Sequence, residues 1–140
     1  MNWTSGRNLL IAVDASALVA ISELEPEARV FAAALLANES QISAVNYVET
    51  GRVLIGRGRL GDKAELDHWL ATLGVSIART ADLGEGALRA YLTFGRGFHP
   101  ARLNLGDCFA YALAKQLDAP LLYKGDDFAL TDVRSALQPT

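Results

Sequence analysis

The chain has 140 residues, of which 51% are hydrophobic and 21% charged, as expected for one globular domain with a single substantial core. Its net charge of −3 argues against a protein whose whole surface follows nucleic acid, because phosphate binding usually requires a basic excess. One cysteine and two histidines exclude an intrachain disulfide and a zinc site of the usual Cys/His kind, so any metal must be held by oxygen.

The sequence predicts neither a membrane span nor a secretion signal. All apolar stretches are far too short to cross a bilayer. Residues 1–8 contain one basic residue, Arg7, and lead into an apolar run that ends in an aspartate, unlike a signal peptide with its cleavage site. We therefore expect a cytoplasmic protein without membrane contacts. We also expect a single domain over residues 1–140, in which residues 1–8 are a short N-terminal extension.

The first predicted elements are a buried strand and a helix. The continuous apolar run Leu9–Val13 indicates a strand that is covered on both faces, and small residues that can turn into a helix follow it. Apolar residues at helical spacing then predict a helix that Pro26 opens and Asn38 closes. Glu25 and Glu27 would lie in its first turn and oppose the helix dipole.

The rest of the chain continues to alternate between the two kinds of element. Periodicity, glycines and capping residues predict a strand over 41–43, helices over 45–55 and 62–73, a strand over 75–78, a helix around 87–92, a helix over 105–116 and a strand over 121–123. The helix around 87–92 should bury Ala87, Leu88, Tyr91 and Leu92. This alternation predicts an α/β fold with a mainly parallel central sheet covered by helices on both faces.

Acidic residues follow the two most strand-like segments. Asp14 ends the first strand, and Asp126 and Asp127 follow the last. In an open α/β sheet the functional crevice lies beyond the carboxyl ends of the strands, so these groups could face one pocket. Glu49 and Asp107 lie near helix starts, which cluster at the same side, and they are candidates to complete the set.

The chemistry of such a cluster favours a hard divalent ion. Each acid also has an ordinary explanation, such as a turn residue for Asp14 or a helix-start residue for Asp107. However, carboxylates held close together repel one another, and a bound cation removes that cost. Mg²⁺ and Mn²⁺ prefer carboxylate and water oxygens and support phosphodiester hydrolysis. The acids therefore indicate phosphoryl chemistry.

Four segments resemble a known family. In order and spacing, the segments "VDASALVAI", "SAVNYVETGRVL", "LNLGDCFAYALAK" and "PLLYKGDDFALTDV" are similar to the acidic motifs of VapC-type PIN-domain endoribonucleases, the toxins of type II toxin–antitoxin systems. The resemblance covers the chain from about Leu10 to Leu137. It implies a PIN-like α/β/α sandwich and a Mg²⁺-dependent endoribonuclease that hydrolyses RNA phosphodiester bonds.

The resemblance also assigns roles to single residues. It implies that Asp14 and Asp107 are the principal Mg²⁺ ligands, with Mn²⁺ as an alternative ion. Glu49 would join them directly or through water, and Ser16 would be a supporting hydroxyl near the metal.

The fourth acid of the family is harder to assign. Many relatives have an acid where this chain has Gly125, so Asp126 and Asp127 are both candidates for the catalytic and metal-binding set. We expect Asp127 to face the pocket, because Phe128 packing inward would anchor its neighbour and a positive φ at Gly125 can redirect the chain.

The family further implies partners. A cognate VapB-like antitoxin would cover the acidic pocket, and the toxin would form a homodimer. Local cations could hold the RNA substrate despite the acidic total, because phosphate contacts need only a few well-placed groups. The candidates are Arg52, Arg96, Arg102 and Lys124.

Other functional classes remain open at this stage. A degenerate PIN domain could bind RNA or a partner without cutting, and only an activity measurement separates it from a nuclease. A receiver-like phospho-acceptor module also has strand-end aspartates and a late lysine, here Lys124, but Ala15 stands where its second adjacent acid would be. A haloacid-dehalogenase-like phosphatase would need an aspartate in place of Ser16.

Overall fold

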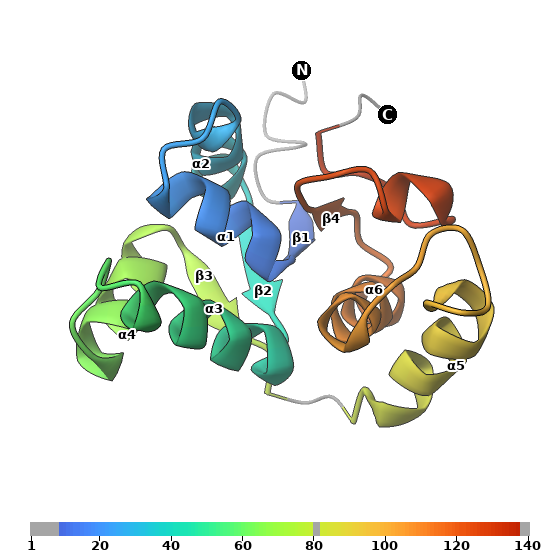
Figure 1. The fold of residues 1–140 in the computed structure, drawn as a ribbon. Helices are drawn as coiled ribbons and strands as arrows, with labels where there is room; N and C mark the ends of the chain where they lie inside the picture. The colour runs from blue at the N-terminus through green and yellow to red at the C-terminus, as the bar shows by residue number, and fades with distance from the viewer. Residues whose placement is uncertain (1–8, 80–81, 138–140) are drawn as a thin grey trace, which may run out of the picture.

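The computed structural model describes residues 9–79 and 82–137, so the expected N-terminal extension over residues 1–8 lies outside the described residues. Most ends of the predicted elements are correct to within about two residues. The described elements are β1 (Leu10–Val13), α1 (Ala15–Ser22), α2 (Ala28–Ala37), β2 (Glu39–Ile42), α3 (Ala44–Gly56), α4 (Lys63–Thr72), β3 (Val75–Ile77), α5 (Gly84–Phe94), α6 (Leu105–Leu117), β4 (Leu121–Leu122) and the 3₁₀ helix η1 (Phe128–Leu130) (Figure 1).

The four strands form one parallel sheet in the order β3-β2-β1-β4. Val13 at the end of β1 is in register with Ile42 of β2 on one side and with Leu122 of β4 on the other. The carboxyl ends of these three strands therefore lie at one edge of the sheet. This arrangement confirms the predicted α/β class with its parallel sheet.

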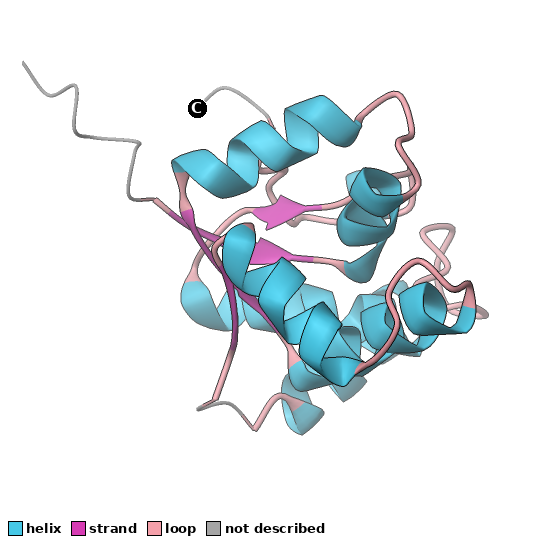
Figure 2. Cartoon of the chain, turned by 90° about the vertical axis from the view of Figure 1, so that its left-hand side faces the viewer, coloured by secondary structure: helices cyan, strands magenta, loops and turns pink. Residues whose placement is uncertain are grey.

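Helices cover both faces of this sheet. Successive side chains of a strand point to opposite faces, and β1 follows this rule. Ile11 and Val13 pack with α1, α2 and α4 in one core, whereas Ala12 packs with α5 and α6 in a second core. Figure 1 shows α1 to α4 on one side of the molecule and α5 and α6 on the other, and Figure 2 shows the strands running between helices. The predicted α/β/α sandwich is thus confirmed.

Two local predictions were wrong. Helix α2 begins at Ala28, so Glu25 and Glu27 precede it, and both form ion pairs with Lys124. Ser43, predicted as the end of a strand, is the N-cap of α3 and accepts a hydrogen bond from the backbone amide of Asn46 at 3.0 Å. The ion pairs with Lys124 hold the two glutamates outside α2, and the capping bond of Ser43 ends β2 and begins α3.

The face that α5 buries also differs from the prediction. Ala87 and Ala90 are buried, but Leu88, Tyr91 and Leu92 are exposed. Helix α5 packs closely against α6, and this contact requires small residues: a Cβ on Gly86 would lie 3.3 Å from the Cβ of Ala112. The larger apolar side chains are therefore left at the surface.

In the part of the chain that the structure describes, no helix is both long enough and apolar enough to cross a membrane.

Candidate functional site

We call the carboxyl edge of the sheet, with the candidate acids Asp14, Glu49, Asp107 and Asp127, the acidic edge. Asp14 lies at its centre. It follows β1 directly and is the N-cap of α1, where its Oδ2 accepts a hydrogen bond from the backbone amide of Ser16 at 3.0 Å. Only 4% of its surface is exposed, because the central strand ends deep between the two helical layers. The fold therefore holds a carboxylate almost completely away from water.

Ser16 joins the ends of two neighbouring strands near this carboxylate. Its Oγ accepts a hydrogen bond from the backbone amide of Lys124 at 3.0 Å, just beyond β4. The backbone amide of Asp14 donates to the carbonyl of Leu122 at 2.9 Å. These bonds fix the turn after β4, which carries Asp126 and Asp127, relative to Asp14.

Glu49 lies on α3, which begins directly after β2. Its carboxylate is half-buried and reaches the first turn of α6. A Cβ added to Gly106 would be only 2.8 Å from Glu49 Oε1. The side-chain amide of Asn46 donates to the same oxygen at 3.3 Å. Helices α3 and α6 thus bring Glu49 next to the residue that precedes Asp107.

Asp107 lies in the first turn of α6 and takes part in its N-terminal cap. Its Oδ2 accepts from the backbone amide of Asn104 at 3.0 Å, and the side chain of Asn104 accepts from the backbone amide of Asp107 at 2.8 Å. The two bonds form a capping box with aspartate in the place of the usual glutamate or glutamine. Because the box uses one carboxylate oxygen, capping and a role at the site are compatible.

The electrostatics show that these acids lie close enough to influence one another. Burial raises the pKa of Asp14 from its ordinary value of 3.8 to about 7, and the negative charges of Asp107 and Glu49 contribute to this rise. Burial also raises the pKa of Asp107 to about 6, with further contributions from Glu49 and Asp127. Two carboxyl groups are therefore partly protonated near neutral pH.

The turn after β4 distinguishes the two candidates for the fourth acid. Gly125 has a φ of +104°, as expected from its predicted role in redirecting the chain. Phe128 is buried. Both Asp126 and Asp127 are exposed, but the charge of Asp127, and not that of Asp126, contributes to the raised pKa of Asp107. This favours Asp127 as the fourth acid, which stays a prediction.

The donor set fits a hard divalent ion in its chemistry. Burial and mutual repulsion make the ionised acids costly, and a cation would offset both. Among residues 9–79 and 82–137, no three acidic, histidine or cysteine side chains lie close enough together to hold one ion as they stand. Mg²⁺ typically keeps several water molecules and needs only one or two direct carboxylate ligands. Asp14 and Asp107 would hold it, with Glu49 and Asp127 reaching it through water.

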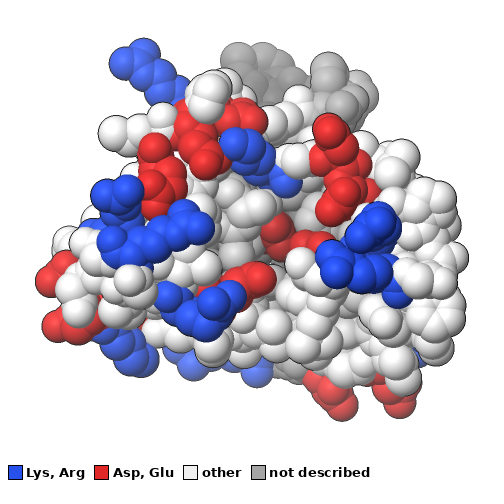
Figure 3. Space-filling model, viewed as in Figure 1, with Lys and Arg blue, Asp and Glu red and all other residues white. Residues whose placement is uncertain are grey.

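Basic side chains lie around the acidic centre. Figure 3 shows Lys and Arg groups on several sides of the acidic groups on this face. Arg52, Arg96 and Arg102 are exposed, and none of the three has an ion-pair partner among the described residues. Lys124 differs, because its ammonium group is paired with Glu25 and lies 3.6 Å from Glu27. Its charge is therefore already compensated.

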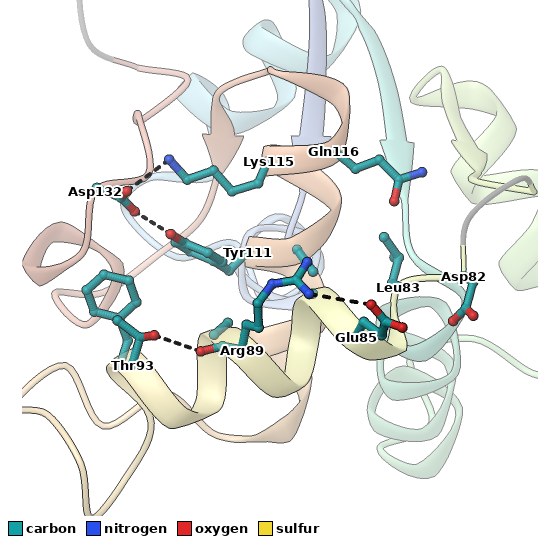
Figure 4. Close-up of a pocket in the computed structure, with 13 residues that line it drawn as sticks. Asp82, Leu83, Glu85, Arg89, Thr93, Tyr111, Lys115, Gln116 and Asp132 are labelled. Carbon is teal, nitrogen blue, oxygen red and sulfur yellow. Dashed lines mark hydrogen bonds and ion pairs between the residues drawn. The ribbon is translucent and has the colours of Figure 1, made fainter.

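A separate cavity of about 790 Å³ lies between α5, α6 and Asp132 (Figure 4). Its lining includes none of the candidate acids. Lys115 pairs with Asp132 at 3.1 Å, Arg89 pairs with Glu85 at 3.6 Å, and the hydroxyl of Tyr111 donates to Asp132 at 2.5 Å. Because four of its charged groups form two ion pairs and none of the candidate acids lines it, we place the candidate site at the acidic edge and not in this cavity.

Two residues at the acidic edge were missed by the analysis of the sequence. Asn46 is completely buried and contacts Glu49, and Gly106 allows the carboxylate of Glu49 to approach α6. A signal was present for Gly106, because glycine is unfavourable inside a helix and this one directly precedes Asp107. Asn46 could not be distinguished from an exposed helix residue by its type.

Comparisons with known proteins agree with this geometry. A family model described as PIN domain matches residues 11–133. Ribonuclease VapC30 of Mycobacterium tuberculosis is 44% identical over 132 residues, which are 92% of this chain and 100% of that protein. Ribonuclease VapC42 of the same species is 45% identical over 127 residues, which are 89% of this chain and 97% of that protein.

A solved structure shares the fold. The crystal structure of Mycobacterium tuberculosis VapC20, described as a sarcin-ricin loop cleaving toxin, has a TM-score of 0.62 and 21% sequence identity, and the match covers 89% of this chain and 98% of that chain. The parallel sheet with acids at its carboxyl edge is thus the architecture of a PIN domain. The chain belongs to the PIN domain family, among its VapC-type ribonucleases. This excludes the phospho-acceptor and phosphatase alternatives.

The raised pKa of Asp14 predicts how Asp14→Asn changes the stability of the metal-free protein. The native state binds more protons than the unfolded state between the ordinary pKa of 3.8 and the folded value of about 7, so wild-type stability falls as the pH rises through this window. Asparagine can keep the cap of α1 and carries no charge. In thermal melts at about pH 8, Asp14→Asn should exceed the wild type by at least about 3 °C, with a smaller gain at about pH 5.

The exposed Asp126→Asn is the matched control and should show no such pH-dependent gain. Equal melting temperatures of the wild type and Asp14→Asn at all pH values would contradict a buried, costly carboxylate.

Proposed function

We propose that this chain is a Mg²⁺-dependent endoribonuclease toxin that hydrolyses RNA phosphodiester bonds. The observation that carries this proposal is an excess of uncompensated negative charge. Among the described residues, Asp14, Glu49 and Asp107 are buried or half-buried without a basic ion-pair partner, whereas the other acids without such a partner, Asp127 among them, are exposed. The ribonuclease names of its relatives support RNA as the substrate.

The residues at the acidic edge would each have a separate role in the reaction. When bound, Mg²⁺ or Mn²⁺ would activate the attacking water and offset the charge that develops on the phosphate. Asp14 and Asp107 would be its direct ligands once they lose their protons. Glu49 and Asp127 would orient water molecules around them. Ser16 accepts a hydrogen bond from the backbone of Lys124 and so holds the start of the turn after β4 close to α1.

The exposed arginines would hold the RNA. Arg52, Arg96 and Arg102 can donate to backbone phosphates without reading the base sequence, and such contacts set the register of a nucleic acid on a protein. Lys124 was expected to join them, but its ion pairs with Glu25 and Glu27 make it a link between β4 and the segment before α2. We therefore assign the RNA contacts to the arginines.

The family membership also supports an antitoxin partner. We propose that a VapB-like antitoxin neutralises the chain by covering the acidic crevice. A basic side chain of the antitoxin would compensate the unpaired carboxylates as the metal does, so antitoxin and metal would compete for the same charges. Cellular RNA as the substrate would place this reaction in the cytoplasm.

An exposed apolar face supports the expected homodimer. Leu88, Tyr91 and Leu105 line a groove of about 300 Å³ between α5 and the start of α6. Phe98 is 57% exposed beside it and stacks edge-on against Tyr91, with 5.4 Å between the ring centroids. An isologous interface needs a surface that fits itself, and this face offers both a recess and a projecting aromatic ring. A second copy of the chain is the proposed occupant.

Light scattering tests this dimer. The wild type should have twice the mass of the 15.0 kDa chain, and Leu88→Asp should have the mass of one chain because a charge in an apolar interface is costly. Leu36→Asp on α2 is the control, since Leu36 is also exposed and should leave the dimer intact. A monomeric wild type would refute the proposal.

Cleavage of RNA by the purified protein tests the proposed function. The wild type should cut total cellular RNA in the presence of Mg²⁺ and lose this activity with a chelator. Asp107→Asn should lower the rate by at least about 100-fold, because the substitution removes a ligand charge with almost no change in volume. Asp127→Ala should also reduce cleavage substantially.

Asp126→Ala provides the matched control for Asp127→Ala, because the two acids are adjacent in one turn. It should retain most of the activity, and the reverse ranking would make Asp126 the fourth ligand. If the wild type binds RNA but does not cut it at any Mg²⁺ or Mn²⁺ concentration, the chain is a degenerate PIN domain and the nuclease proposal is wrong.

A further inference from the structure

A single buried amide connects helices α3 and α6 beside the acidic crevice. Asn46 is 0% exposed, and its Oδ1 accepts a hydrogen bond from Ser43 Oγ at 2.6 Å. Its Nδ2 donates to the carbonyl of Gly106 at 3.0 Å and to Glu49 Oε1 at 3.3 Å. The carbonyl of Gly106 can only accept, so the amide nitrogen must face α6. The Glu49 carboxylate then meets a donor of fixed direction.

Gly106, on α6, leaves just enough space for the Glu49 carboxylate to approach that helix. An ideal Cβ at this position would lie 2.8 Å from Oε1, 2.9 Å from Oε2 and 3.1 Å from Cδ of Glu49. Any other residue would therefore push the carboxylate away. Because glycine is unfavourable inside a helix, its presence in the first turn of α6 is explained by this close approach.

We propose that Asn46 and Gly106 together form a Glu49 clasp, a pair of positioning residues that holds the Glu49 carboxylate beside Asp107 for metal binding. This inference rests on the proposed function, since it assigns Glu49 to the metal site. Neither residue contacts the metal or the RNA; both act through Glu49.

A glutamate on a helix needs such support. Its side chain has several rotatable bonds and, without a partner, would sample many orientations. Glu49 contributes to the raised pKa values of both Asp14 and Asp107, so its charge lies close to theirs. Residues that orient metal ligands typically change metal affinity by about 10- to 100-fold when they are removed.

Gly106→Ala separates positioning from a merely structural role. The substitution leaves the hydrogen bonds of Asn46 with Ser43 and with the carbonyl of Gly106 in place, and the atoms in its way are the far end of the flexible Glu49 side chain. Alanine is also the better helix former. The melting temperature of the metal-free protein should therefore not fall, although the carboxylate must move.

The experiment measures Mn²⁺ binding by calorimetry on the full chain. Gly106→Ala should bind Mn²⁺ about 10- to 100-fold more weakly than the wild type. Its RNA cleavage should recover as the Mg²⁺ concentration rises, which a folding defect would not allow. The matched control is Gly56→Ala at the end of α3, where an added Cβ meets nothing within 4 Å and binding should not change.

Asn46→Ala tests the other half of the clasp, with Thr50→Val as its control. Thr50 is equally buried on α3 and donates a hydrogen bond of 2.8 Å to the Asn46 carbonyl, so both variants lose a buried hydrogen bond. Only Asn46→Ala should weaken Mn²⁺ binding.

The outcomes distinguish the two proposals. Unchanged Mn²⁺ affinity in Gly106→Ala, with wild-type protein that binds Mn²⁺ and cuts RNA, would overturn the clasp and leave the proposed function standing. Equal weakening by Asn46→Ala and Thr50→Val would overturn the role of Asn46. A wild-type chain that neither binds Mn²⁺ nor cuts RNA would overturn the proposed function, and the clasp with it.

Discussion

The burial of one carboxylate at the end of the central strand is the constraint on which the rest of the structure depends. Asp14 is 4% exposed and has no basic partner among the described residues. An isolated buried charge is costly, and burial accordingly raises the pKa of this group to about 7. The protein tolerates this cost at the one place where a cation, a proton or a basic side chain of a partner can remove it.

The parallel sheet explains how distant segments meet at this charge. The ends of β1 and β4 are joined through Ser16, and α3 and α6 both begin beyond the same edge. Local capping interactions then fix the first turns of these helices, so that Asp107 serves both its own helix and the crevice. The hydrogen bonds that end the strands and begin the helices also hold the acids in place. The same bonds therefore contribute both to the stability of the fold and to the geometry of the site.

The sequence predicted the elements from local pattern, namely apolar periodicity and capping residues, and it proposed the acids from carboxylates after strands and near helix starts. The roles of these acids stay a prediction. Prediction from the sequence failed where contacts between distant segments decide the outcome. The leucines of α5 face solvent because alanines pack against α6, and Lys124 pairs with acids about a hundred residues earlier in the chain. The contact of Asn46 with Gly106 joins two helices far apart in sequence, and no local pattern predicts it.

The central claim is that the acidic edge holds protons that a divalent metal displaces. Metal ligands must be deprotonated, so binding to partly protonated carboxyl groups releases protons. Mn²⁺ calorimetry in buffers of different ionisation enthalpy counts these protons directly. With pKa values of about 7 for Asp14 and about 6 for Asp107, we expect clear proton release at about pH 6.5 that nearly vanishes at about pH 8.5. Mn²⁺ binding with no proton release at either pH would contradict the account.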